Sequence, residues 1–213
     1  MIRILIADDH AIFRHGLRQI LEENSDMSVD GEASNGQDVL DQIWRNDFDL
    51  LLLDINMPGM SGLETLKQLK AQKPKLKVLV LSMYPEEQYA IRALKAGASG
   101  YITKASASEE LIEAIRKVSQ GGKYVSASLA EKLILDFESD IDRLPHELLS
   151  DREFEVLCMI ASGKTVSQIA EELCLSVKTV STHRVRILEK MRMKNNAELT
   201  NYAIKHELID ISD

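Results

Sequence analysis

The chain has 213 residues, with a hydrophobic content of 45%, a charged content of 28% and a formal net charge of −8. These values are typical of an ordinary soluble globular protein of one or two domains. No apolar run approaches the roughly 20 residues that a membrane-spanning helix needs, and Asp8 and Asp9 end the first apolar stretch too early for a secretory signal. We therefore expect a cytoplasmic protein with no membrane association.

In the first 120 residues, short apolar runs alternate with amphipathic stretches. The runs predict strands at 2–7, 28–33, 49–54, 77–82 and 100–103. Apolar residues at helical spacing, such as Ile12, Leu17, Ile20 and Leu21, predict helices at 11–23, 36–46, 62–73, 86–96 and 107–120. This alternation predicts an α/β doubly wound five-stranded parallel sheet over residues 1–120, with helices on both faces. The apolar runs are continuous, as expected of strands that are buried on both sides.

The alternation stops after Gly121 and Gly122. Residues 121–148 contain one amphipathic piece, SLAEKLILDF, and an acidic stretch, which together predict a linker with one helix. From 149 to 213 only helical spacing remains, and Ser150 with Glu153 forms a capping-box pattern at the start of the first of four helices. We predict an all-α domain there.

Two cysteines, Cys158 and Cys174, fall in apolar helical segments of this second part. A zinc site or a disulfide is the alternative. Because isolated cysteines behave as small hydrophobic residues, we expect both thiols to be buried.

Polar groups follow several of the predicted strands at the same edge of the sheet. Asp8 and Asp9 follow the first strand, Asp54 ends the leucine run of the third, Ser82 ends the fourth and Lys104 follows the fifth. In an open parallel sheet, functional groups gather just beyond the carboxyl ends of the strands. A single Asp at a strand end is more often a helix N-cap, and a single Lys is more often solvated. The joint placement of all five groups instead favours one shared site.

Three neighbouring carboxylates repel one another, and a divalent cation would offset that repulsion. Mg²⁺ suits the set, because it binds one or two carboxylates, a carbonyl and waters, and leaves a position for a phosphoryl oxygen. The turn at Pro58 and Gly59 would let the carbonyl of Asn56 face the metal. Asp54 could then attack phosphorus to form an acyl phosphate, with Lys104 and Ser82 as groups that contact the phosphoryl oxygens.

The segments ADDH (7–10), LLLDINMPGMSG (51–62), LSM (81–83) and GYITK (100–104) resemble the receiver domain of two-component response regulators. The resemblance covers residues 1–120 and implies that Asp54 is the phosphoryl acceptor. It implies that Asp9, Asp54 and the Asn56 carbonyl bind Mg²⁺ and that Asp8 acts on the metal through water. The pair of residues that switches conformation would be Ser82 and Tyr101. Lys104 would bind the phosphoryl group, and a histidine kinase or a small acyl phosphate would donate it.

One position departs from the common receiver pattern. Met83 follows Ser82 where many receivers have a smaller residue, and Tyr84 comes next. Both side chains would crowd the approach of a hydrolytic water. We therefore expect slower loss of the phosphoryl group here than in a Met83→Ala variant.

The acidic total hides one basic segment. Residues 176–194 carry six Lys or Arg side chains against a single acid, Glu189. The first helix of this pair would place Val166, Ile169, Ala170 and Leu173 inward, and the second would place Val177, Val180, Ile187, Leu188 and Met191 inward. A helix with small polar residues at its start and flanking arginines suits a DNA major groove. A solvated cationic face is the alternative.

Residues 149–191 resemble the helix-turn-helix domain of the NarL and LuxR (FixJ) families. The resemblance implies that Ser181, Thr182 and Val185 face base edges. It implies that the phosphate contacts come from Lys178, Thr179, His183, Arg184, Arg186 and Lys190. Val185 departs from relatives that carry a basic or smaller residue there, and His183 could instead pack beneath the helix. The last helix, 196–208, would pair with its copy in a second subunit.

We interpret the sequence as a response regulator that acts as a transcription factor. Phosphorylation of Asp54 by a histidine kinase would control dimerisation and binding to double-stranded promoter DNA, with RNA polymerase as a candidate partner. The chain would not be an enzyme, although a receiver assists its own phosphorylation and dephosphorylation.

Two other classes remain as alternatives. A phosphatase resembling haloacid dehalogenases would place its nucleophile after the first strand in a D-x-D pattern, whereas this strand ends in adjacent Asp8 and Asp9. A regulator acting through protein or RNA contacts would not bind duplex DNA through the basic helix.

Overall fold

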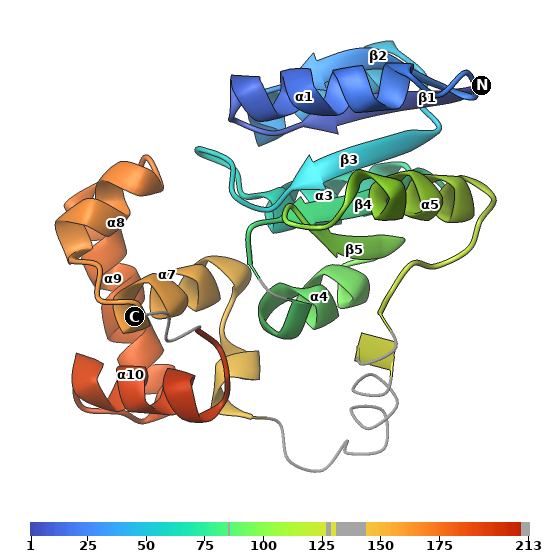
Figure 1. Cartoon of the computed structure of the whole chain (residues 1–213). Coiled ribbons are helices and arrows are strands. Elements are labelled where there is room, and N and C mark those ends of the chain that lie inside the picture. The colour runs from blue at the N-terminus through green and yellow to red at the C-terminus, as the bar shows by residue number, and fades with distance from the viewer. Residues whose placement is uncertain (85, 127–128, 131–143, 210–213) are drawn as a thin grey trace. The chain divides into compact units, whose positions relative to one another are not determined.

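The computed structural model describes residues 1–84, 86–126, 129–130 and 144–209 (Figure 1). The strands are β1 (Ile2–Ala7), β2 (Met27–Ala33), β3 (Leu50–Asp54), β4 (Lys77–Ser82) and β5 (Gly100–Thr103). Between and after them lie α1 (Ala11–Glu22), α2 (Gly36–Arg45), α3 (Gly62–Gln72), α4 (Glu86–Lys95) and α5 (Ser108–Ser119). The remaining elements are the short 3-10 helix η1 (Pro145–Leu148), α7 (Asp151–Ala161), α8 (Val166–Glu172), α9 (Val177–Met191) and α10 (Asn196–Lys205). Each predicted strand and helix outside the linker is therefore confirmed, to within a few residues at its ends.

The five strands form one parallel sheet in the order β2-β1-β3-β4-β5. The strand order reverses direction between β1 and β3, which are hydrogen-bonded neighbours with a helix–strand–helix segment between them in sequence. In sheets of this kind, the crevice beyond the carboxyl ends of the strands at the reversal is the usual place for a site. Asp8 and Asp54 follow or end these two strands.

Helices cover the two faces of the sheet. On one face, α1 and α5 lie side by side (Figure 1) and pack Leu17, Leu21 and Ile115 against β-strand residues such as Ile4 and Leu52. The leucine run of β3 is buried throughout, as the continuous apolar pattern predicted. Burial of this kind stabilises the sheet by roughly 25 cal/mol per Å² of apolar surface removed from water.

A tight turn follows β3 and carries the chain into α3. Gly59 has φ +76°, in the left-handed region that favours glycine. A side chain at Gly62 would put its Cβ 2.1 Å from the Asp54 carbonyl oxygen, so no larger residue fits there. Ser61 and Glu64 then form a capping box at the N-terminus of α3. These local features define where β3 ends and α3 begins.

The chain divides into two compact units, Met1–Ala130 and Glu131–Asp213. The first unit extends past α5 because Tyr124 joins the edge of the sheet. The N–H group of Tyr101 donates to the Tyr124 carbonyl at 3.2 Å, and the Tyr124 N–H group donates to the Ser99 carbonyl at 3.0 Å. The helix predicted within 128–137 lies largely outside the described residues.

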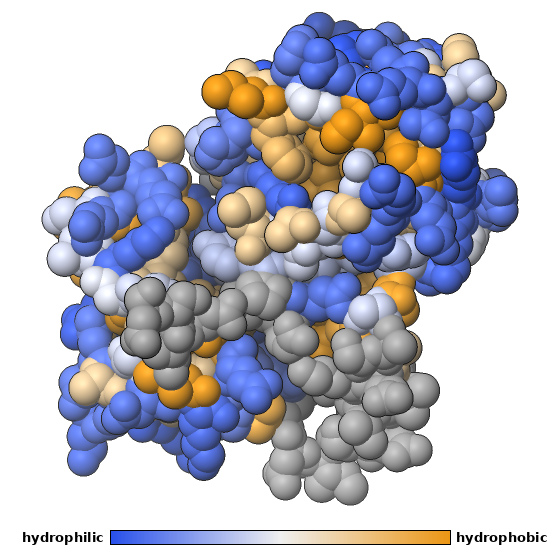
Figure 2. Space-filling view, viewed as in Figure 1, coloured by the Kyte–Doolittle hydropathy of each residue, from blue (hydrophilic) through white to orange (hydrophobic). Residues whose placement is uncertain are grey.

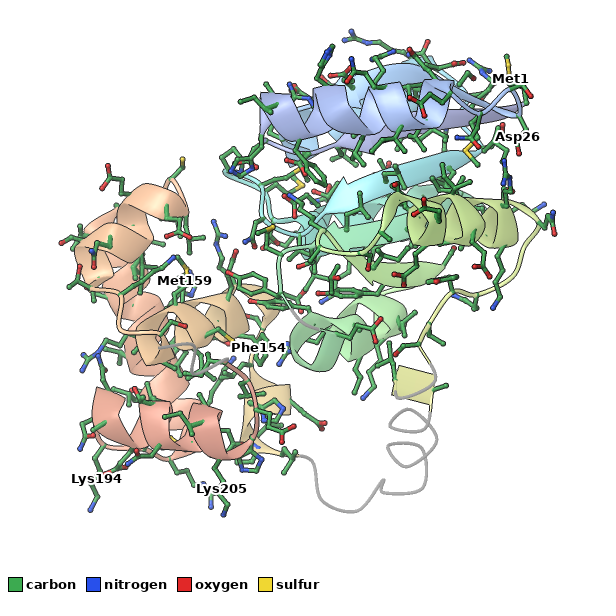
Figure 3. The ribbon with its side chains drawn as sticks, viewed as in Figure 1. Met1, Asp26, Phe154, Met159, Lys194 and Lys205 are labelled. Carbon is green, nitrogen blue, oxygen red and sulfur yellow. The ribbon has the colours of Figure 1, made fainter. Side chains whose placement is uncertain are left out.

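The second unit is a helical domain centred on α7. Every residue of α7 from Arg152 to Ala161 is buried, and Phe154 and Met159 lie among the surrounding helices (Figure 3). The predicted capping box of Ser150 and Glu153 is present. Ser176 caps α9 by accepting a hydrogen bond from the Thr179 N–H group at 3.0 Å. The helices of this unit therefore begin where the sequence predicted.

Three apolar or thiol side chains differ from the sequence-based expectation. Ile12 is 91% exposed, because it lies five residues before Leu17 and so about 140° around the helix from that buried face. Val177 is 51% exposed, since it opens α9 at the free end of the apolar stripe. Cys174 is exposed, whereas Cys158 is buried as predicted. The helical pattern does not apply to Cys174, because α8 ends at Glu172 and Cys174 turns the chain with φ +53°.

No helix in the described part of the chain is both long and apolar enough to cross a membrane.

Candidate functional site

The carboxyl ends of β1, β3 and β5 bring three charged groups into contact. Lys104 Nζ lies 2.6 Å from Asp8 Oδ2 and 2.7 Å from Asp54 Oδ2. Asp8 and Asp54 are each only 1% exposed. The Lys104 backbone N–H group donates to the Ser82 carbonyl at 2.7 Å, which fixes the root of the lysine beside β4. The ammonium group therefore neutralises two buried carboxylates at once, a role that sequence reasoning did not give to Lys104.

The protonation of this cluster departs from that of free side chains. Burial raises the pKa of Asp54 to about 6, although the nearby Lys104 ammonium works in the opposite direction. Burial alone would lower the pKa of Lys104, but the carboxylates of Asp54 and Asp8 outweigh it and raise that pKa. With a pKa of about 6, Asp54 is largely ionised at neutral pH.

Two residues at the start of α1 belong to this site but were not predicted as site residues. The Lys104 ammonium lies 4.7 Å from the centre of the Phe13 ring, a cation–π contact that helps to hold the lysine in place. His10 Nδ1 lies 2.7 Å from Asp9 Oδ1 and 3.4 Å from Asp8 Oδ1. The signal for His10 was its position directly after the two aspartates. Phe13 had no such signal, because an aromatic residue on a helix usually belongs to the core.

The donor set of this site fits a divalent metal ion. One ligand atom from each of Asp8, Asp9, His10 and Asp54 lies within 4.8 Å of the other three. Asp8 and Asp54 are buried, while Asp9 and His10 are exposed, so the cluster is open to solvent on one side. Carboxylate oxygens are the ligands that Mg²⁺ prefers in proteins. The Asn56 N–H group donates to Asp54 Oδ1 at 3.1 Å, whereas a metal contact by the Asn56 carbonyl stays a prediction.

The predicted switch residues, Ser82 and Tyr101, both contact the backbone of Tyr84. Ser82 Oγ accepts a hydrogen bond from the Tyr84 N–H group at 3.0 Å. The hydroxyl group of Tyr101 donates to the Tyr84 carbonyl at 2.9 Å. Tyr101 is fully buried, which raises its pKa, and the Tyr84 ring stacks on Tyr89 with centroids 4.8 Å apart. Movement of Ser82 would therefore disturb the backbone that the Tyr101 hydroxyl group contacts.

The two residues after Ser82 differ in their exposure to solvent. Met83 is 72% exposed, and Tyr84 is half-buried. Shielding of the site by Met83 can therefore be only partial.

In the second unit, α9 presents the predicted basic face. Lys178, Thr182, Val185, Arg186 and Lys190 are exposed, and Ser181 is half-buried. Val180, Ile187 and Met191 are buried on the opposite face. The hydroxyl groups near the start of the helix have local partners, since Thr179 Oγ1 lies 2.7 Å from Ser176 Oγ. Thr182 Oγ1 donates to the Lys178 carbonyl at 2.9 Å.

Two of the predicted phosphate contacts, Lys190 and Arg184, have partners inside the unit. Lys190 Nζ lies 2.6 Å from Glu153 Oε2 on α7, and Arg184 Nε donates to Asn196 Oδ1 at 2.7 Å. His183 is half-buried. Sequence spacing placed Lys190 and Arg184 on the helix surface but could not reveal that neighbouring helices supply partners for them.

Two family models match the chain. Residues 4–116 match the response regulator receiver domain, and residues 147–203 match the bacterial regulatory proteins of the luxR family. The receiver match alone covers more than half of the chain. The chain belongs to the response regulators. Its sheet is the receiver sheet, and α7 to α10 make up the luxR-family domain.

Full-length relatives agree with this assignment. The response regulator GacA of Pseudomonas viridiflava is 37% identical over 213 residues and covers 100% of both chains. The oxygen regulatory protein NreC of Staphylococcus epidermidis is 40% identical over 216 residues, which cover 98% of this chain and 99% of NreC. Both relatives match this response regulator through both of its units.

Solved structures of response regulators also resemble this one. RcsB from Salmonella enterica serovar Typhimurium, bound to promoter rprA in the presence of the phosphomimetic BeF₃⁻, has a TM-score of 0.65 and 28% identity, with 95% of this chain and 98% of RcsB covered. The response regulator ChrA of a heme-sensing two-component system has a TM-score of 0.53 and 31% identity, with 98% of each chain covered.

Proposed function

We propose that Asp54 is the phosphoryl acceptor of this response regulator. The observation that carries the proposal is the pairing of the buried Asp54 with the buried Asp8 through Lys104 at 2.6–2.7 Å. An Asp54 oxygen attacks phosphorus, the bond from phosphorus to the donor atom breaks, and the product is an acyl phosphate. The Lys104 ammonium then transfers its contact from the carboxylates to the phosphoryl oxygens and stabilises their charge.

Asp8, Asp9 and Asp54 would hold Mg²⁺ in this reaction, with the Asn56 carbonyl as a further ligand. The ion supplies positive charge that offsets repulsion between the carboxylates and the incoming phosphoryl group. The proposal is supported by the mutual distance of the donor atoms and by the open, exposed side formed by Asp9. The donor would be a histidine kinase or a small acyl phosphate, so the receiver assists its own phosphorylation without being an enzyme for a separate substrate.

Phosphorylation would act on Ser82 and Tyr101 through the Tyr84 backbone. A phosphoryl group on Asp54 would attract the Ser82 hydroxyl group, and movement of that group would weaken the hydrogen bond that it accepts from the Tyr84 N–H group. The Tyr84 carbonyl holds the Tyr101 hydroxyl group, so both residues respond together. Such a change at the β4–β5 edge would control dimerisation of the protein.

The second unit would bind double-stranded promoter DNA through α9. Ser181, Thr182 and Val185 would face base edges in the major groove. Lys178 and Arg186 would contact phosphates. Thr179, His183, Arg184 and Lys190 are weaker candidates, because their side chains have partners within the unit or are partly buried. RcsB, the neighbour that was solved as two dimers on two parallel DNAs, supports a dimeric DNA complex.

The domain limits predicted from the sequence stay a proposal, with a receiver at 1–120, a linker at 121–148 and a DNA-binding domain at 149–213. A cytoplasmic location and contact with RNA polymerase also stay proposals.

The experiment that tests the function uses the full chain with acetyl phosphate and Mg²⁺. Intact mass should rise by one phosphoryl group in the wild type and stay unchanged in Asp54→Asn. Gel filtration with beryllofluoride and Mg²⁺ should then show a dimer for the wild type only, and the dimer should bind duplex promoter DNA with a strong dependence on salt. A phosphoryl group found in Asp54→Asn would contradict the assignment of the acceptor.

A further inference from the structure

His10 occupies the N-cap position of α1 without capping the helix. Its backbone is extended there, and its side chain accepts no hydrogen bond from the first turn. The N-cap residues of α2, α3, α7, α8, α9 and α10 are Ser, Thr or Asn, and each accepts such a bond. A capping residue in place of a non-capping one typically stabilises a protein by about 1 kcal/mol. The imidazole at this position therefore does not serve the stability of the helix.

The His10 side chain instead faces the carboxylates. Its Nδ1 atom lies 2.7 Å from Asp9 Oδ1 and 3.4 Å from Asp8 Oδ1. One of its two ring nitrogens also lies within 4.8 Å of a carboxylate oxygen of Asp54. The His10 backbone N–H group donates to Asp8 Oδ1 at 2.9 Å, so the residue is tied to the acidic pair at two points. The His10 side chain is 70% exposed, which leaves its nitrogen accessible to an ion that enters from solvent.

We propose that His10 supplies a nitrogen ligand to the divalent ion bound by Asp8, Asp9 and Asp54, and thereby favours a first-row transition-metal ion over Mg²⁺. The inference rests on the proposed function, because it concerns the cation site of the phosphoryl acceptor. Mg²⁺ takes oxygen ligands almost exclusively, whereas imidazole is a good ligand for transition-metal ions. To bind an ion through Nδ1, His10 would carry its ring proton on Nε2, and the contact of Nδ1 with Asp9 would give way to the ion.

Lys104 limits the side from which an ion can reach the carboxylates. The Lys104 ammonium occupies the side of the cluster between Asp8 and Asp54. An ion must therefore enter from the side of Asp9 and His10, which are the exposed members of the group. The imidazole of His10 therefore lies where an ion that reaches the carboxylates would meet it.

The test compares wild type, His10→Asn and His15→Asn by calorimetry with Mn²⁺ and with Mg²⁺. His10→Asn keeps a polar residue that can cap α1, so a frayed helix does not account for weaker binding. His15 is an exposed histidine on the same helix and serves as the matched control. We expect His10→Asn to lower Mn²⁺ affinity by roughly tenfold, a loss at the lower end of that seen even for outer-sphere partners of metals. Affinity for Mg²⁺ should be almost unchanged, and His15→Asn should resemble the wild type for both ions.

Electron spin echo envelope modulation of bound Mn²⁺ detects directly whether a nitrogen atom is bound to the ion. Coupling to a ¹⁴N nucleus should be present in the wild type and in His15→Asn, and absent in His10→Asn. If Mn²⁺ and Mg²⁺ bind and acetyl phosphate labels the protein, yet the ¹⁴N coupling is absent, the His10 inference is overturned while the proposed function stands. If the wild type binds neither ion and accepts no phosphoryl group, both are overturned.

Discussion

The receiver cluster and the basic face of α9 differ in how firmly the structure holds their charged groups. At the receiver site, Asp8, Asp54 and Lys104 are buried and contact one another. On α9, Lys178 and Arg186 are exposed, and no ion pair is found for either within the described ranges. Buried charges must be paired, so their geometry is fixed before any ligand arrives. Exposed charges are free to adapt to a partner.

This difference separates chemistry from recognition. Attack on phosphorus requires groups placed within a fraction of an ångström, which burial and pairing provide. Phosphate contacts on DNA require charge and reach, which flexible surface side chains provide. Lys190 lies between the two cases, because it is exposed but contacts the buried Glu153.

The largest expected effect is at the receiver site, where the charged groups are buried and paired. Replacing Lys104 with Met should slow phosphorylation by acetyl phosphate about 100-fold, since a preorganised charge beside a transferring group contributes about that much. Mass spectrometry over time measures the rate. Lys75→Met, a change at an exposed lysine of the same unit, should leave the rate unchanged. A normal rate in Lys104→Met would show that the buried pairing is structural only.

A second prediction concerns the free energy of unfolding of the receiver. The pKa of Asp54 is raised to about 6 in the folded protein, from an unfolded value near 4. A raised carboxyl pKa contributes stability that is fully present below the unfolded value and is lost as the pH rises through about 6. Asp54→Asn should therefore be more stable than the wild type at pH 7.5 without Mg²⁺, by about 1–3 kcal/mol.

Urea unfolding monitored by Trp44, the single tryptophan and a residue of the first unit, measures this difference. The difference in free energy of unfolding between Asp54→Asn and the wild type should become smaller as the pH falls from 7 to 4. It should also become smaller when Mg²⁺ is added to the wild type. A difference that does not vary with pH would mean that burial does not raise the pKa of Asp54.

The third prediction compares two lysines on α9. Lys178→Ala should lower the slope of log K against log salt by about 1 per subunit, as expected for a lost phosphate contact. Lys190→Ala should leave the slope nearly unchanged. It should instead lower the free energy of unfolding of the second unit by about 1 kcal/mol, because the buried Glu153 carboxylate would lose its cationic partner while keeping the hydrogen bond from the Ser150 N–H group. Fluorescence anisotropy with promoter DNA and thermal unfolding separate the two outcomes.

The smallest effect is expected at Met83. Its side chain is 72% exposed, so it shields the acceptor only in part. Met83→Ala should shorten the lifetime of the phosphorylated protein by about twofold, a change well under 1 kcal/mol in the barrier. An equal or longer lifetime in the variant would contradict the shielding that the sequence predicted.

Much of the fold could be predicted because the local signals agree with one another. The leucine run of β3, the Pro58–Gly59 turn and the Ser61–Glu64 capping box each indicate the same ends for the same elements. The convergence of Asp8, Asp54 and Lys104 follows from parallel topology, because each stands directly after a strand. Such residues are placed by the backbone alone.

The parts that sequence reasoning missed depend on contacts between elements. Phe13 beneath the Lys104 ammonium and Glu153 beside Lys190 meet their partners only once the helices pack. Cys174 is exposed because a chain turn with φ +53° interrupts the helical pattern. A periodic pattern cannot report side-chain partners or single-residue turns of this kind.

The unequal burial of the two thiols gives the protein a pair of natural reporters. Cys158 is 3% exposed and Cys174 is open to solvent, so a thiol-reactive dye will attach at the turn that precedes α9. Trp44 in the other unit can serve as the energy-transfer donor. Energy transfer between these two sites would report whether phosphorylation of Asp54 changes their separation, without a single engineered residue.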